Sequence, residues 1–93
     1  MVKIVDNDIW RGTEKIGWIE GNDIYSAAGS RKVGYFTSND IYDINGNKVG
    51  WIEGNFLKTI EGRSIRLEEN RARIMGSTAS DLTRAAIRLL LGD

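Results

Sequence analysis

The sequence predicts a mainly β domain of four hairpin repeats, followed by one C-terminal α-helix. Two short motifs recur in the same order between residues 7 and 70, and an apolar segment without glycine follows over residues 78–91. At 93 residues, the chain is the size of one small domain. We therefore expect a four-hairpin β domain over residues 1–70 and a helical segment over residues 76–92.

The composition argues against several classes of function. Thirteen basic and thirteen acidic residues give a net charge of zero, which argues against a nucleic-acid or anionic-membrane surface. The chain has no Cys and no His, so it lacks thiolate metal ligands, a Cys nucleophile and the commonest general base. We expect no enzyme activity, no catalytic residues, no metal and no cofactor.

Membrane insertion and export are not predicted either. The stretch 82–91 contains three polar residues and is half the roughly 20 residues that a membrane span requires. The first residues lack the apolar core of a signal peptide. We expect a soluble protein in the cytoplasm.

The first repeated motif is Asn-Asp-Ile followed by an aromatic residue. It occupies residues 7–10, 22–25 and 39–42, with a weaker copy at 55–57. The repeats start 15, 17 and 16 residues apart. This spacing allows two strands of about five residues and two tight turns, so each unit is predicted to be a β-hairpin.

The second motif places a glycine between an aliphatic and an aromatic residue, giving Gly17, Gly34 and Gly50. Glycine inside a strand marks a bend or a close backbone approach. Three equivalent glycines predict strong curvature, with the strands crowding a central axis. In the fourth unit we place Arg66 at the glycine position and Leu67 at the aromatic position.

Turn residues connect these strands into a meander of about eight strands, with residues 3–5 as a candidate extra strand. Asn45-Gly46 predicts a type I′ turn, in which both residues have a positive φ. Gly21-Asn22 and Gly54-Asn55 predict tight turns, so adjacent units should pair antiparallel. We expect burial of one of two rings: Ile16, Val33, Val49 and Ile65, or Trp18, Tyr35, Trp51 and Leu67.

Together the two motifs read Lys-(Ile/Val)-Gly-(Trp/Tyr)-(Ile/Phe)-Glu-Gly-Asn-Asp-Ile-Tyr. With this repeated pattern and the run 43–48, the chain resembles the bacterial four-fold beta flower proteins. The resemblance covers residues 3 to 70. It implies four hairpins about a pseudo-four-fold axis, often followed by an apolar C-terminal helix. It implies no established activity and no catalytic residues. The fourth unit departs from the pattern, as a terminal capping repeat would.

The apolar C-terminal segment predicts a helix over residues 78–91, capped by Ser77 or Ser80 and ended by Gly92. Its polar residues are confined to Asp81, Arg84 and Arg88. A helix with so wide an apolar face requires burial on more than one side. We expect a homo-oligomer formed through this helix; packing across its own sheet is the alternative. The candidate interaction residues are Leu82, Ala86, Leu89 and Leu90.

The recurring aromatic residues suggest a second function. Most should be core residues, but Trp10, Tyr25 and Tyr42 are candidates for an exposed platform that stacks on a sugar. Glu20 and Glu53 recur at equivalent positions and would be the acid–base pair of an enzyme. We therefore predict a protein-interaction or self-assembly module, with carbohydrate or other small-ligand binding as the alternative.

Overall fold

A single sheet makes up most of the protein. The computed structural model describes residues 1–76 and 78–92. Within these residues the strands are β1 (Val2–Val5), β2 (Asp8–Arg11), β3 (Glu14–Glu20), β4 (Asp23–Ser26), β5 (Arg31–Thr37), β6 (Asp40–Asp43), β7 (Lys48–Glu53), β8 (Phe56–Thr59), β9 (Ser64–Arg66) and β10 (Ile74–Met75). The helices are α1 (Leu67–Arg73), α2 (Asp81–Leu91) and the short 3-10 turn η1 (Ala28–Ser30). The predicted mainly β fold with a C-terminal helix is confirmed.

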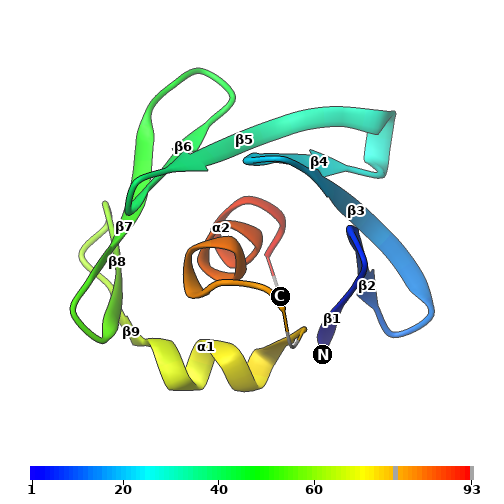
Figure 1. Cartoon of the computed structure of the whole chain (residues 1–93). Helices are drawn as coiled ribbons and strands as arrows, with labels where there is room; N and C mark the ends of the chain where they lie inside the picture. Colours follow the sequence, from blue (N-terminus) through cyan, green and yellow to red (C-terminus); the bar gives the residue numbers. More distant parts are fainter. Residues whose placement is uncertain (77, 93) are drawn as a thin grey trace.

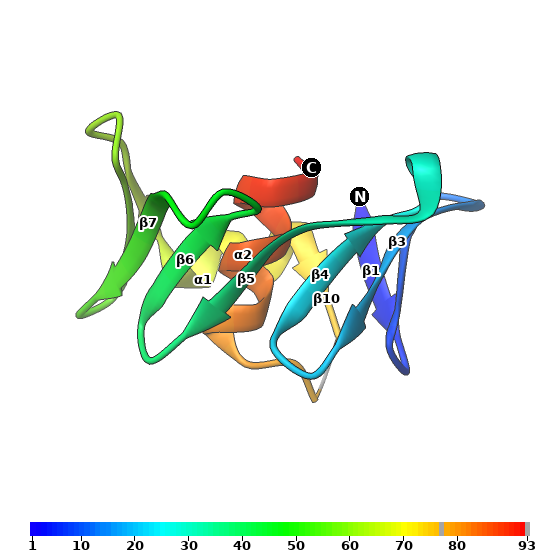
Figure 2. The same cartoon turned by 90° about the horizontal axis from the view of Figure 1, so that it is seen from above.

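The ten strands of the described chain lie in the order β10-β1-β2-β3-β4-β5-β6-β7-β8-β9. Figure 1 shows this sheet curling around α2, with α1 on the remaining side. Four hairpins form the ring, and we call them petals one to four: β2–β3, β4–β5, β6–β7 and β8–β9. Figure 2 shows the petal tips on the same side as the C-terminal end of α2, and we call this side the mouth.

The turns between petals each place one residue at positive φ. These residues are Gly21 (60°), Ser38 (57°) and Gly54 (60°), and Asp6 (56°) has the same place before petal one. Glycine adopts this conformation without steric cost. The strands on either side of each turn pair antiparallel, as predicted for adjacent units.

The tip of petal three is not the predicted type I′ turn. Gly46 has φ 83°, but Asn45 does not have a positive φ. The Asp43 carboxylate accepts hydrogen bonds from the backbone N–H groups of Asn45 and Asn47, at 2.9 and 3.0 Å. The prediction was wrong because this side chain organises a longer loop, in which only the glycine is left-handed.

A β-bulge recurs beside the strand glycine in three petals. In petal one the register skips Ile16, the residue before Gly17. Val33 and Val49 are skipped in the same way in petals two and three. A bulge bends its strand and increases its twist. The bulges and the adjacent glycines together supply the predicted curvature.

Petal four lacks this bulge, so its second strand contains no skipped residue. Ile65 pairs with Leu57, which is the place of the inner glycine in the other petals. Arg66 then stands at the aromatic position. Our assignment of Arg66 and Leu67 to the glycine and aromatic positions was wrong, because it assumed the same number of residues in every unit.

The core is a ring of residues that the repeats share. Each petal contributes the apolar residue of its first strand, and all are 0% exposed: Ile9, Ile24, Ile41 and Leu57. We expected burial of one of the two rings beside the strand glycines. In petals one to three both of those rings are only half-buried. The physical reason is that the glycines themselves face inward, against α2.

The C-terminal helix begins later than predicted, at Asp81 rather than Thr78. Ser80 caps it, because its Oγ accepts a hydrogen bond from the backbone N–H of Thr83 at 3.1 Å. The other candidate cap, Ser77, lies outside the described residues. Gly92 ends the helix with φ 79°, as predicted.

The middle of α2 is enclosed by the sheet. Ala85, Ala86 and Ile87 are 0% exposed, and the helix contacts β4, β5, β6 and β7 as well as α1. Packing of the helix across its own sheet, the alternative in our sequence analysis, is therefore present. None of the helices in the described parts of the chain is long and apolar enough to cross a membrane.

Two elements, α1 and β10, were not predicted. The four-hairpin β domain was expected to extend to residue 70, but its last petal strand ends at Arg66 and α1 follows directly. Acidic residues in the first turn of α1 and basic residues in its last turn favour this short helix. β10 then pairs in parallel with β1, so the ring closes through α1 and not through a strand. The expected domain boundary at residue 70 falls inside α1.

Candidate functional site

Three consecutive leucines of α2 meet three successive petals. The inner glycines of petals one, two and three contact Leu91, Leu90 and Leu89 respectively. An α-helix turns by about 100° per residue, which is close to the quarter turn between petals. Successive side chains of α2 therefore reach successive petals. The centre of the ring is filled by this packing and offers no ligand cavity among the described pockets.

The four candidate interaction residues of α2 belong mainly to this core. Ala86 is 0% exposed, so it is wrong as an interface residue. Leu89 and Leu90 pack on petals three and two and are half-buried, as is Leu82. The sequence marked these residues as apolar, but could not show that the ring of the same chain surrounds them.

The three candidate platform residues lie on three different petals. Tyr25 stacks on Trp18 with ring centroids 5.2 Å apart, and Tyr42 stacks on Tyr35 at 5.1 Å. Trp10 has the corresponding place on petal one. All three candidates are half-buried. The structure therefore distributes them around the outer face of the ring and does not gather them into one platform.

In petals one to three, a lysine lies over an aromatic ring and also binds an aspartate. The lysine nitrogens of petals one to three lie 5.0–5.5 Å from the ring centroids of Trp18, Tyr35 and Trp51. Each lysine also pairs with an aspartate on the preceding strand: Lys15 with Asp8, Lys32 with Asp23, and Lys48 with Asp40, at 3.0–3.1 Å. The aromatic partner of Trp18 and Tyr35 lies on the following strand. Trp18 and Tyr35 are thus each in contact with both a tyrosine ring and a lysine.

The two glutamates considered as an acid–base pair bind tryptophans. Glu20 accepts a hydrogen bond from Trp18 Nε1 at 2.8 Å, and Glu53 accepts one from Trp51 Nε1 at 3.1 Å. Each contact lies within one strand on the outer face. The carboxylates are therefore engaged on separate petals, and no group of His, Cys, Asp and Glu in the described residues could hold a metal ion.

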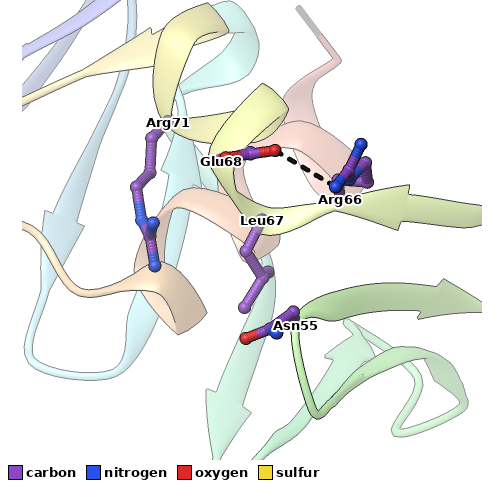
Figure 3. Close-up of a pocket in the computed structure, with 5 residues that line it drawn as sticks. All are labelled: Asn55, Arg66, Leu67, Glu68 and Arg71. Carbon is purple, nitrogen blue, oxygen red and sulfur yellow. Dashed lines mark ion pairs between the residues drawn. The ribbon is translucent and has the colours of Figure 1, made fainter.

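A polar pocket of about 230 Å³ lies where α1 begins. Figure 3 shows Asn55, Leu67 and Arg71 around it, with Arg66 and Glu68 paired at 3.4 Å. Arg71 donates to both Asp81 carboxylate oxygens, at 2.7 and 2.6 Å. This hydrogen bonding lowers the pKa of Asp81 and raises that of Arg71. The charges cancel in pairs, and the lining holds no nucleophile, so neither catalysis nor anion binding is favoured here.

The predicted polar strip of α2 faces α1 and β10. Arg84 donates to the carbonyl oxygens of Ile74 at 2.9 Å and of Ala79 at 2.7 Å, and also to that of Gly76. Arg88 donates to Asn70 Oδ1 at 3.3 Å. These bonds attach the helix to the side of the ring that is formed by α1, β10 and the segment after β10. The strip is structural and is not an exposed charged surface.

The mouth is a further candidate surface. Ile44 and Ile60, at the tips of petals three and four, are 54% and 65% exposed. A pocket of about 410 Å³ lies between petals one and two, and its apolar lining is Ile16, Ala27–Ala28 and Leu91. We did not select the tips from the sequence. The available signal was that the repeats resemble one another along their strands but differ at their tips.

Comparison with known proteins supports the fold assignment. The family model described as 4-fold beta flower protein matches residues 10–86. No curated protein and no solved structure matches the chain. The matched region begins within β2 and covers the rest of the four petals, α1, β10 and about half of α2. The chain therefore belongs to the 4-fold beta flower family.

Proposed function

We propose that this protein is a non-enzymatic module that self-associates through its mouth. The observation that carries the proposal is the pair of exposed isoleucines, Ile44 and Ile60, on neighbouring petal tips of the ring. Exposed tip loops on a rigid scaffold are common binding elements. A large isoleucine at the end of a polar loop has no role in the core, and an interface would remove it from water.

The size of the mouth is suitable for a dimer. The Cα atoms extend over 31 × 29 × 20 Å, and Figure 2 shows the short direction along α2. A disc of these two larger dimensions has a face of roughly 700 Å², close to the ~800 Å² per partner of a standard interface. The mouth also contains the last turn of α2, so the proposal retains the part of our prediction that concerns the C-terminal helix.

Carbohydrate binding receives less support. The candidate rings Trp10, Tyr25 and Tyr42 lie on three different petals, and two of them, Tyr25 and Tyr42, already stack on Trp18 and Tyr35. Carbohydrate binding remains a prediction from the sequence, as does the cytoplasmic location. The absence of enzyme activity is likewise part of the proposal. The separate engagement of Glu20 and Glu53 supports it.

The proposal is tested by measuring the mass of the full chain by sedimentation equilibrium across micromolar to millimolar concentrations. We expect a reversible dimer that Ile60→Lys weakens by about tenfold or more, because the variant buries a charge in the interface. Met75→Lys is the matched control, since Met75 is 48% exposed but lies on β10, outside the petal tips. A native chain that stays monomeric throughout, or equal weakening by both variants, would contradict the proposal.

A further inference from the structure

We infer that a single small anion, of the size of chloride, binds between α1 and α2 at Asn70 and Arg88. The inference is independent of the proposed self-association, because these residues lie on the two helices and not at the petal tips. It follows from a buried amide without an acceptor, from a cation without a carboxylate, and from the lack of a larger described pocket at these residues.

Asn70 is a buried amide that lacks an acceptor for its Nδ2 group. It lies on α1, which faces α2 in Figure 1, and it is 1% exposed. Its Oδ1 accepts a hydrogen bond from Arg88 Nη1 at 3.3 Å. Its Nδ2 has no acceptor among the described residues. Because nearly all buried polar groups in proteins have a partner, an unpaired one indicates a bound water molecule or ion.

Arg88 brings a positive charge to the same place without a carboxylate to balance it. The side chain is half-buried, and its bond to Asn70 is to a neutral oxygen. Within residues 1–76 and 78–92, Arg88 forms no ion pair. The acidic residues of the two helices pair with other arginines: Glu68 with Arg66, Glu69 with Arg73, and Asp81 with Arg71. A guanidinium has five N–H donors, so Arg88 has donors to spare.

An anion fits these donors better than a water molecule does. A ligand that reaches both Asn70 Nδ2 and Arg88 must accept a hydrogen bond from each. A water molecule accepts both bonds, but it also has to direct its own two hydrogens to acceptors, and it leaves the charge unbalanced. A halide has no hydrogens to direct, and its negative charge offsets the desolvation of the half-buried guanidinium.

The ligand must also be small. None of the described pockets includes Asn70 or Arg88 in its lining. A single-atom anion needs only about the space of one water molecule. Polyatomic anions such as phosphate require more room, so the site favours chloride.

Thermal unfolding of the full chain tests the site through its dependence on chloride. Sodium chloride replaces sodium gluconate at constant ionic strength, so the screening of surface charges is unchanged. A ligand that binds only the folded state stabilises that state by mass action. Between about 1 and 100 mM chloride, we expect the unfolding temperature of the native chain to rise by about 5 °C. Equal unfolding temperatures in the two salts would overturn the inference.

Asn70→Asp is the most direct variant, because it builds a carboxylate into the site. The new carboxylate has the shape of the amide and pairs with Arg88 at pH 7, in place of the anion. We therefore expect this variant to lose the dependence on chloride. Arg63→Gln is the matched control, since it removes an arginine from the tip of petal four, away from the two helices. A chloride response in Asn70→Asp equal to that of the native chain, or loss of the response in the control, would contradict the assignment.

Crystals of the native chain soaked in bromide locate the anion without relying on the folding of any variant. Bromide is a heavier halide, and its anomalous scattering should give a peak within hydrogen-bond distance of both Asn70 Nδ2 and Arg88. The lack of an anomalous peak there, with or without ordinary density for a water molecule, would refute the anion. Neither measurement depends on self-association, so either result leaves the proposed function unaffected.

Discussion

Each inner glycine of the sheet faces one leucine of α2, so the absent side chain of the glycine leaves the space that the leucine fills. On three sides of the helix the sheet contributes no side chain and the helix contributes a leucine. On the fourth side the sheet contributes Ile65, and the next helix residue in the series, Arg88, reaches α1 instead. The space between sheet and helix is filled in both cases. Close packing of this kind leaves no room for an added methyl group.

Gly34→Ala tests this match. The new Cβ would lie 2.7 Å from Leu90 Cδ1 and closer still to the backbone carbonyl oxygen of Tyr42. Because a backbone atom cannot move away without distorting β6, we expect a loss of about 3 kcal/mol in the free energy of unfolding. Urea denaturation measures it. Thr37→Ala, at the exposed end of the same strand, is the control and should change stability by less than about 0.5 kcal/mol. Equal stabilities of the two variants would refute the packing argument.

Helix α2 has two different attachments to the rest of the fold. Its apolar sides pack on the petals, whereas its polar strip bonds to α1 and to the segment after β10. Asp81 lies at the start of this strip and binds Arg71 of α1. The carboxylate near the helix N-terminus also interacts favourably with the helix dipole. These contacts determine which side of the helix faces which petal.

The Asp81 contact predicts a specific dependence on pH. Hydrogen bonding by Arg71 lowers the pKa of Asp81 in the folded protein. The pair therefore stabilises the fold above the unfolded pKa of roughly 3.9, and this contribution is lost as the pH falls through the lower folded value. We expect Asp81→Asn to lower stability at pH 7 by at most about 1 kcal/mol, because the pair is partly exposed.

Thermal unfolding of Asp81→Asn and the native chain at pH 7 and at about pH 2 measures this difference. The difference in melting temperature between Asp81→Asn and the native chain should be smaller at the lower pH. Glu69→Gln is the control, because Glu69 makes only a looser exposed pair with Arg73, at 3.8 Å. A gap for Asp81→Asn that is independent of pH would show that the ion pair is not its cause.

The molecule as a whole has its core inside a ring, and the last helix supplies a central part of that core. Ala85, Ala86 and Ile87 are fully buried, and the petal ring Ile9, Ile24, Ile41 and Leu57 packs in the same cluster. A fully buried large aliphatic side chain contributes roughly 1.5–3 kcal/mol. The total stability of a small domain is only about 5–15 kcal/mol. The ring therefore has little stability without α2.

Truncation after Met75 tests this dependence. We expect the chain of residues 1–75 to be unfolded, because the inner face of every petal would be exposed to water. Loss of the near-ultraviolet circular dichroism of Trp18 and Trp51 would report it. Leu82→Ala in the full chain is the control: it removes one half-buried side chain and should leave the fold intact. A truncated chain with native dichroism would show that the petals are stable by themselves.

The repeats made most of the fold predictable, since a motif that recurs four times indicates its own strands and turns. The glycines also indicated the curvature, because glycine weakens a strand and occurs inside one mainly at bends and close backbone contacts. The alignment of petal four was not predictable in the same way. Its missing bulge shifts Ile65 into the glycine position, and a bulge leaves no mark on a sequence when its residue is an ordinary Ile or Val.

The candidate site was less predictable than the fold. The apolar stripe of α2 was visible in the sequence, but whether Ala86 contacts its own chain or another depends on what surrounds the helix. Likewise, the aromatic motif was visible, but the stacking of Tyr25 on Trp18 requires the register between β3 and β4. The exposed isoleucines at the tips became candidates only when their exposure was known.

By itself, the sequence determined the four hairpins, the bends at Gly17, Gly34 and Gly50, and the apolar character of the last helix. These properties are local, since they depend on turn residues, alternation and composition over a few positions. Only the tertiary structure decided that α2 occupies the axis, that α1 closes the ring and that the tips share one face. Each of these depends on contacts between residues far apart in the chain, and such contacts arise from the packing of the complete ring.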